Sequence, residues 1–388
     1  MRYATMKLQL SAEFVRPMQG WRGLLAAGAA GLALAFSNLA PSIATAGEAG
    51  PDLSGSGQSV FLPYLNAPLA SAPITRPPQV GVSVGGAVVR AVLDTGSTGV
   101  VIAARAIPNL SQLKSLGPGT ITYTSSGRIM RGDWVVAPVT LSGPNGAQVT
   151  SRPIPVLAVR RIDCLKAARN CRVRTHPTHV AMVGIGFARE KDRQAEGTPD
   201  RNPLLNLPAM GTPEAPGAMR RGYVVTKQGI QVGVTAEGAK GFTFAKLDKS
   251  DRFPDWAPIP VCLSLNDRQP PACGTVLVDT GVDTMYLTLP ASQLNGQTVQ
   301  APDGKPTLPP SARLNLDLLG EGKGVSYAFA VGNAADSVAP ARVILVPRPG
   351  EEAFVNTSVR LLNRFDYLFD ADAGYAGFRS RMPRGAAH

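Results

Sequence analysis

The chain has 388 residues, of which 44% are hydrophobic and only 17% charged, so a core can form and a disordered, collagenous or coiled-coil chain is excluded. Glycine (41) and proline (34) are frequent, which favours short strands and turns over a helical bundle. The net charge of +12 suggests nucleic-acid binding, but no nucleic-acid-binding signature accompanies it, so we expect no nucleic-acid partner.

The first 46 residues have the layout of an export signal. Its basic residues are Arg2, Lys7, Arg16 and Arg22. They precede an apolar stretch over residues 24–36 and an Ala-Thr-Ala cleavage site at residues 44–46. The apolar stretch is shorter than the roughly 20 residues that cross a bilayer, although an uncleaved anchor is the alternative. We predict a signal peptide over 1–46, a flexible leader over 47–75, and a periplasmic or secreted protein of a Gram-negative-type bacterium.

Alternation of apolar and small residues begins at Val80, Val82 and Val84 and predicts a strand. Gly85-Gly86 predicts a two-residue hairpin turn, and residues 87–93 a return strand that runs into Asp94-Thr95-Gly96.

The exported chain keeps four cysteines, Cys164, Cys171, Cys262 and Cys273. Two close pairs, 164–171 and 262–273, are the natural disulfides for an oxidising compartment, although four cysteines allow three connectivities. A metal site is the rival interpretation, but no Cys-x-x-Cys occurs, and His176 with His179 completes no familiar ligand set. We expect neither a metal nor another cofactor.

A second segment repeats the design of the first. Residues 261–265 and 274–278 are predicted strands around a polar loop, and the second strand runs into Asp279-Thr280-Gly281. The two aspartates are 279 − 94 = 185 positions apart, which is too long for a solenoid repeat and fits two homologous lobes. We place the lobes at 76–248 and 249–388.

Paired aspartates have a definite chemistry. Two carboxylates side by side cannot both ionise cheaply, so they share one proton. The ionised member can take a proton from water while the other donates one to a carbonyl oxygen. The glycines let the backbones approach, and the threonine hydroxyls can hydrogen-bond across to the opposite loop.

This constellation resembles the pepsin-like aspartic proteases over residues 79–379. Residues 92–98 and 278–281 look like the two active-site motifs of that family, residues 182–186 like the strand behind the first motif, and residues 367–378 like the closing hairpin. The resemblance implies an all-β, bilobal fold with two β-barrel-like lobes and an active-site cleft between them. It also implies that Asp94 and Asp279 are catalytic.

The resemblance assigns further roles. Thr95, Gly96, Thr280 and Gly281 would support the loops, and Ser97 would support Asp94. Residues 121–133 look like the flap hairpin, with Tyr123 closing over the substrate. The expected flap and substrate-binding residues are Tyr123, Ser125, Gly127 and Asp283.

The sequence also departs from the family pattern. Val101 stands where the family usually has a tryptophan that partners the flap tyrosine. Val282 cannot hydrogen-bond the outer oxygen of Asp279 as threonine or serine would. No apolar-apolar-Gly follows in the second lobe; Ser358 is expected at the glycine position, and Arg360 to pair with Asp283.

The predicted function is therefore an aspartic endopeptidase, a monomer that takes an extended peptide. A catalytically silent peptide- or envelope-binding protein on the same scaffold is the alternative, and a structural envelope protein is a third. The basic segment from Arg160 to Arg174 is either a solvated loop or a surface for an anionic envelope component.

Overall fold

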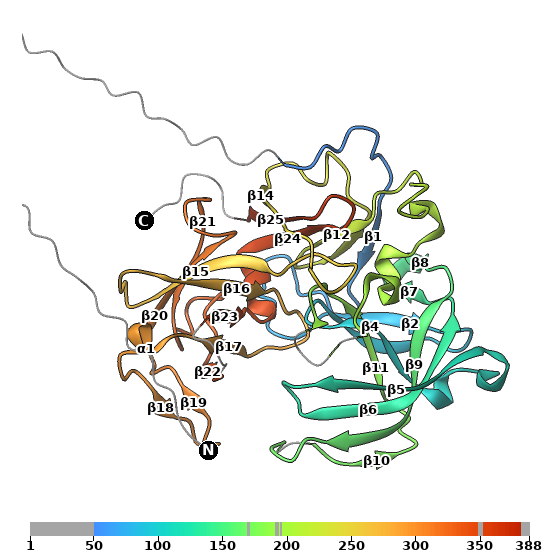
Figure 1. Ribbon diagram of the computed structural model, residues 1–388, viewed down its shortest axis with the longest axis horizontal. Coiled ribbons are helices and arrows are strands. Elements are labelled where there is room, and N and C mark those ends of the chain that lie inside the picture. The colour runs from blue at the N-terminus through green and yellow to red at the C-terminus, as the bar shows by residue number, and fades with distance from the viewer. Residues whose placement is uncertain (1–49, 169–170, 191–193, 195, 348–351, 382–388) are drawn as a thin grey trace, which may run out of the picture. The chain divides into compact units, whose positions relative to one another are not determined.

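In the part of the chain that the structure describes, short apolar runs separated by Gly- and Pro-rich turns form three β-sheets (Figure 1). The computed structural model describes residues 50–168, 171–190, 194, 196–347 and 352–381. The residues described belong to one compact unit of the chain, Ala46–His388. The predicted signal peptide over 1–46 lies outside the described residues.

A ten-stranded sheet carries the first Asp-Thr-Gly. Its strands are β2 (Gln79–Ser83), β3 (Val89–Asp94), β4 (Thr98–Ala103), β5 (Lys114–Tyr123), β6 (Arg128–Ala137), β7 (Thr140–Ser142), β8 (Gln148–Thr150), β9 (Ile154–Cys164), β10 (Arg174–Thr175) and β11 (Ala181–Ile185). Their order is β5-β6-β9-β4-β11-β3-β2-β7-β8, with β10 paired to β9. Every residue of β4 is buried, as its unbroken apolar run after the loop predicts.

A nine-stranded sheet carries the second Asp-Thr-Gly. Its strands are β15 (Ile259–Leu265), β16 (Ala272–Leu277), β17 (Met285–Thr288), β18 (Val299–Gln300), β19 (Pro306–Thr307), β20 (Arg313–Leu318), β21 (Val325–Ala330), β22 (Val343–Leu345) and β23 (Ala353–Asn356). Their order is β18-β19-β22-β17-β23-β16-β15-β20-β21.

Both sheets use the same local topology at the Asp-Thr-Gly loops. In the first, β11 lies between β3 and β4, parallel to β3 and antiparallel to β4. In the second, β23 lies between β16 and β17 with the same two orientations. The internal repeat predicted from the sequence is therefore a repeat of structure.

A six-stranded sheet joins distant parts of the chain. Its strands are β1 (Val60–Pro63), β12 (Gly222–Val225), β13 (Gly229–Val232), β14 (Thr243–Lys246), β24 (Phe365–Asp370) and β25 (Tyr375–Ser380), in the order β1-β13-β12-β24-β25-β14. Strand β24 pairs with β12, so this sheet draws strands from both sides of residue 248.

The expectation of a flexible leader over residues 47–75 is wrong for the part of it that forms β1. Val60–Pro63 pairs with β13, and Leu62 is fully buried. The apolar run Val60-Phe61-Leu62 forms this edge strand directly after Gly- and Ser-rich residues.

The first hairpin does not turn at Gly85-Gly86 alone. The last pair of the β2–β3 ladder is Val82 with Val89, so the connection is longer than the two-residue turn predicted. The loop instead folds against a neighbouring segment: a Cβ on Gly86 would lie 2.6 Å from Pro108 and 2.9 Å from the carbonyl oxygen of Ala106. Tertiary packing therefore overrides the local turn signal here.

Helices are few in the described part of the chain. They are α1 (Ala291–Leu294) and the 3-10 helices η1 (Ala104–Ala106), η2 (Leu110–Gln112), η3 (Pro144–Gly146), η5 (Pro199–Arg201), η6 (Pro203–Leu205), η7 (Pro208–Met210) and η8 (Val359–Asn363). None of the helices in the described segments has the length and apolar character needed to cross a membrane.

Candidate active site

The two Asp-Thr-Gly loops meet and hold each other through their threonines. The backbone N–H of Thr95 donates to Thr280 Oγ1 (3.1 Å), and that of Thr280 donates to Thr95 Oγ1 (3.0 Å). Each hydroxyl donates in turn to a carbonyl of the opposite strand end: Thr95 to Val278 (2.6 Å) and Thr280 to Leu93 (2.7 Å). The expected cross-loop hydrogen bonds are present and nearly symmetric.

The carboxyl groups of Asp94 and Asp279 each pack against the glycine of the opposite loop. A Cβ on Gly96 would lie 2.3–2.5 Å from the carboxyl atoms of Asp279, and one on Gly281 would lie 2.4–3.0 Å from those of Asp94. Any side chain at either position would push the carboxyl group away, so both glycines are required for the approach. The residues that the sequence placed 185 positions apart thus form one buried pair.

Each aspartate is held by its own loop and by one further donor. The Oδ1 atoms accept the N–H groups of Gly96 (2.7 Å) and Gly281 (2.8 Å), respectively. The Oδ2 atom of Asp94 accepts from the hydroxyl of Ser97 at 2.5 Å, as predicted. The Oδ2 atom of Asp279 accepts from the side-chain amide of Asn356, also at 2.5 Å.

Asn356 is the site residue that sequence reasoning missed. Val282 provides no donor to Asp279, as expected, but the donor comes from the end of β23 instead of the loop. The signal in the sequence was a polar residue at the end of the apolar run of β23. The equivalent position in β11 of the first lobe is the apolar Met182.

The electrostatics of the pair favour one shared proton. Asp94 and Asp279 are only 5% and 6% exposed. Burial raises the pKa of Asp279 above its ordinary value, and the neighbouring charge of Asp94 raises it further. The amide of Asn356 and the guanidinium of Arg189 lower this pKa, but less than burial and Asp94 raise it.

The predicted flap is a hairpin, and Tyr123 lies at its end. Strands β5 and β6 pair up to Tyr123 and Arg128 around a four-residue turn. Tyr123 is buried in an apolar cluster with Val101, Met130 and Trp134, and its hydroxyl has no hydrogen-bond partner among the residues described. Burial raises the pKa of Tyr123, the charge of Asp94 raises it further, and the hydroxyl of Ser97 lowers it.

The other predicted flap and binding residues lie in different surroundings. Ser125 is exposed, whereas Gly127 is buried with a φ of +68° that favours glycine. Asp283 is exposed and accepts from Thr284. The expected Arg360–Asp283 pair is wrong, because Arg360 instead donates to the carbonyl of Ser337 (3.2 Å).

Both predicted disulfides, Cys164–Cys171 and Cys262–Cys273, are formed. The first closes a loop that contacts the flap turn: the N–H of Leu165 donates to the carbonyl of Gly127 (2.8 Å), and a Cβ on Gly127 would meet that of Ala168. Strand β6 is also paired with β9 from Arg128 to Ala137. The flap is therefore backed along its length by a third strand.

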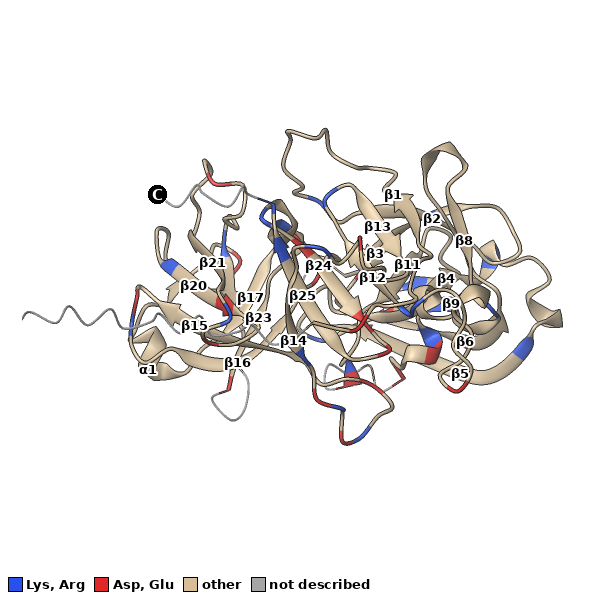
Figure 2. Ribbon diagram, turned by 90° about the horizontal axis from the view of Figure 1, so that it is seen from above, with Lys and Arg blue, Asp and Glu red and all other residues tan. Residues whose placement is uncertain are grey.

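The described basic residues of the segment from Arg160 to Arg174 are exposed. Figure 2 shows how Lys and Arg (blue) and Asp and Glu (red) are distributed over the ribbon. Arg161 and Arg131 both bind Asp163, at 2.6 and 2.7 Å. Three further basic side chains of the described segment are exposed and have no carboxylate partner among the described residues: Lys166, Arg172 and Arg174.

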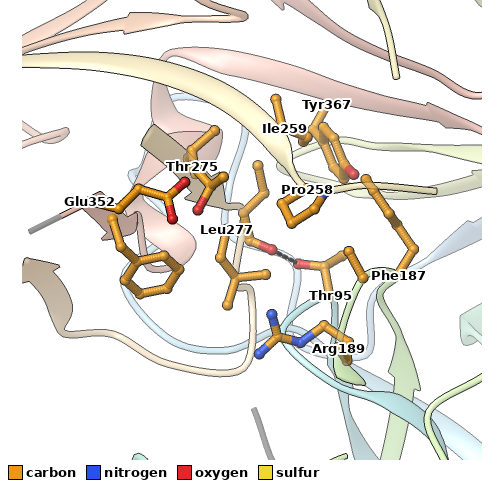
Figure 3. A pocket seen from close by; sticks show the side chains of 13 residues that line it. Thr95, Phe187, Arg189, Pro258, Ile259, Thr275, Leu277, Glu352 and Tyr367 are labelled. Atoms are coloured by element: carbon orange, nitrogen blue, oxygen red, sulfur yellow. Dashed lines mark hydrogen bonds between the residues drawn. The ribbon is translucent and has the colours of Figure 1, made fainter. Parts of the chain in front are cut away.

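A pocket of about 80 Å³ lies beside the Thr95–Val278 hydrogen bond (Figure 3). Glu352 lies at one end of it, and Phe187 and Tyr367 lie at the other. Neither Asp94 nor Asp279 lines the pocket, so it is not the place where the aspartate pair would meet a substrate. Within the segments that the structure describes, no three His, Cys, Asp or Glu side chains gather as a metal site would require.

Comparison with known proteins identifies the fold. No model of a known protein family matches the chain, and a search of curated proteins finds no match. Among solved structures, 397 chains match, including the crystal structure of aspartic proteinase from Irpex lacteus, with 14% identity and a TM-score of 0.50. That match covers 85% of this chain and 99% of the proteinase. The predicted all-β, bilobal, pepsin-like fold is thus confirmed, and at this identity the likeness establishes the fold alone.

Proposed function

We propose that this protein is an aspartic endopeptidase that hydrolyses peptide bonds with a water activated between Asp94 and Asp279. The observation that carries the proposal is the reciprocal packing of each carboxyl group against the glycine of the opposite loop. A buried carboxyl pair of this kind shares a proton and so contains both an acid and a base.

The proposed reaction uses the two carboxyl groups in turn. The ionised aspartate takes a proton from the water while the water oxygen attacks the carbonyl carbon. The protonated aspartate gives its proton to the carbonyl oxygen. The carboxyl that gained a proton then delivers it to the amide nitrogen. The other carboxyl recovers a proton from the gem-diol as the C–N bond breaks. The hydrogen bonds between the threonines would keep the two loops fixed through these steps.

The proposed substrate is an extended peptide bound under the flap hairpin, with Tyr123, Ser125, Gly127 and Asp283 as candidate contacts. We propose a monomer exported to the periplasm or the medium. Two disulfides support an oxidising compartment for the chain.

The test is peptide cleavage by the purified chain beginning at residue 47, using a broad peptide library. Asp94→Ala and Asp279→Ala should each abolish cleavage, because neither carboxyl can act as acid and base alone. Asp251→Asn serves as the matched control, since this exposed acid lies outside the two Asp-Thr-Gly loops and the flap hairpin. Equal cleavage by the wild type and both Ala variants would show a contaminant. Peptide binding without cleavage would instead favour the silent binding protein.

We also propose that the basic segment from Arg160 to Arg174 binds an anionic envelope component. Support comes from Lys166, Arg172 and Arg174, which are exposed and lack a carboxylate partner in the described part of the chain. Wild-type protein should sediment with anionic vesicles at low salt and not at high salt. The Lys166→Ser/Arg172→Ser/Arg174→Ser variant should not sediment with them, and retained binding by this variant would refute the proposal.

A further inference from the structure

The two lobes support their aspartates from exchanged positions. Ser97 and Val282 both lie three residues after their aspartate. Val92 and Leu277 each lie two residues before the aspartate of their lobe. Met182 pairs with Val92, and Asn356 pairs with Leu277, so Met182 and Asn356 hold equivalent strand positions. The first lobe therefore has its polar residue in the loop and an apolar one in the strand, whereas the second lobe has the reverse.

The orientation of the Asn356 amide is fixed by its neighbours. The backbone N–H of Ser358 can only donate, and it donates to Asn356 Oδ1 at 3.1 Å. The amide NH₂ group must then face Asp279 Oδ2, where it lies at 2.5 Å. Asn356 is only 7% exposed, which leaves little access for water to replace this contact.

Asn356 and Ser97 differ in what they can do for a carboxyl group. A hydroxyl is both donor and acceptor, so Ser97 can donate to ionised Asp94 or turn to accept from protonated Asp94. The sulfur of Met182, 3.8 Å from Ser97 Oγ, is available to the hydroxyl proton in the second case. An amide NH₂ only donates, so Asn356 favours the ionised form of Asp279.

We propose that Asn356 is the positioning residue of Asp279 and makes the pair unequal: Asp94 carries the shared proton, and Asp279 takes the proton of the attacking water. This assignment rests on the proposed endopeptidase function and deepens it. Asn356 acts through Asp279 and has no part in the bond-breaking itself.

The other ionisable groups near Asp279 act in the same way in the wild type and in the variants described below. Arg189 lowers the pKa of Asp279, and Asp94 raises it. Burial raises the pKa of Tyr286, and the charges of Asp279 and Asp283 raise it further. Tyr123 responds in the same way to Asp94. None of these groups changes in the variants below, so they cancel in the comparison.

The test follows the carboxyl carbons of Asp94 and Asp279 by NMR, in aspartate-labelled protein, with assignments from Asp94→Asn and Asp279→Asn. At a pH where the pair holds one proton, the wild type should show a carboxylate signal for Asp279. Asn356→Leu, which has nearly the same shape without the donor, should raise the pH at which Asp279 titrates by about one unit.

Three further variants sharpen the measurement. Met182→Leu changes the equivalent strand position of the other lobe and should leave the Asp279 signal unchanged. Val282→Ser/Asn356→Leu returns the donor to the loop and should restore the titration of Asp279. If Asn356→Leu does not fold, Asn356→Ala also removes the donor without adding an ionisable group and should show an upward shift as well.

Activity provides the second readout. Asn356→Leu should lower kcat by roughly tenfold or more and move the acidic limb of the pH–rate profile upward, with KM nearly unchanged. An unchanged Asp279 titration in Asn356→Leu would overturn the assignment, as would a protonated Asp279 in the wild type. Cleavage that survives loss of either aspartate would instead overturn the proposed function. The NMR titration does not depend on activity, so the two failures can be told apart.

Discussion

The two Asp-Thr-Gly loops are alike where they touch each other and different where each touches its own lobe. The threonine hydrogen bonds are almost the same from either side, at 3.1 and 3.0 Å between the loops and 2.6 and 2.7 Å to the carbonyls. The support of the outer oxygens comes from Ser97 in one lobe and from Asn356 in the other. Contacts shared by two loops constrain both sequences, whereas a contact within one lobe can be supplied from any neighbouring strand.

The largest expected effect comes from removing the loop hydroxyl in one lobe only. Ser97→Ala should lower kcat/KM by roughly 10- to 100-fold, because the Oδ2 atom of Asp94 loses its buried hydrogen bond to the Ser97 hydroxyl. Val282→Ala, at the equivalent loop position, should change kcat/KM by no more than about twofold. Steady-state kinetics of the two variants measure the asymmetry, and equal losses would contradict it.

The symmetric part of the comparison is tested by stability. Thr95→Val and Thr280→Val should each lower the free energy of unfolding by about 1–3 kcal/mol, since each leaves buried backbone groups without their partner. Urea unfolding of both variants beside the wild type checks the prediction. A large cost for one and none for the other would show that the loops do not hold each other equally.

The charge repulsion within the pair predicts a pH dependence of stability. Because burial and mutual repulsion make the buried pair of Asp94 and Asp279 keep one shared proton, the folded chain holds more protons than the unfolded chain above the ordinary carboxyl pKa of about 4. The free energy of unfolding should therefore fall by about 1–3 kcal/mol as the pH rises above this value. Asp279→Asn and Asp94→Asn should each flatten the dependence, and an unchanged slope in both would refute the cause given.

The smallest effect concerns the backbone behind each loop. Gly184 pairs with Asp94, and a Cβ there would lie 2.7–2.8 Å from atoms of Ser97. Ser358 holds the corresponding place, with a φ of +60° that disfavours a side chain. Ser358→Gly should therefore raise the unfolding free energy by about 0.5–1 kcal/mol, as thermal unfolding would reveal. Destabilisation would mean that the weak contact of Ser358 Oγ with the N–H of Arg360, at 3.4 Å, outweighs the strain.

The features that could be predicted from the sequence are those that repeat along the chain or depend on residues close together in it. The all-β class, the two loops and both disulfides follow from alternation, spacing and cysteine pairing, whereas the flap hairpin and the Ser97 contact follow from the resemblance to the pepsin-like aspartic proteases. Asn356 was not predicted, because its role depends on the register of β23 against β16, which lies more than 70 residues away in the chain. The Arg360 contact failed for the same reason, since long-range placement decides which partner a flexible side chain reaches.

Strand β1 sets a limit on how the amino-terminal part of this chain can be processed. Leu62 is fully buried, the amine of Lys227 is held by the carbonyls of Ala70 (2.7 Å) and Ala72 (2.9 Å), and Ile74 bonds Asn363 in both directions. A maturation cut that discarded residues 60–75 would remove an edge strand and several anchors of the six-stranded sheet. We therefore expect any segment released on maturation to end before Val60, and an expression design that begins at residue 76 should yield insoluble chain.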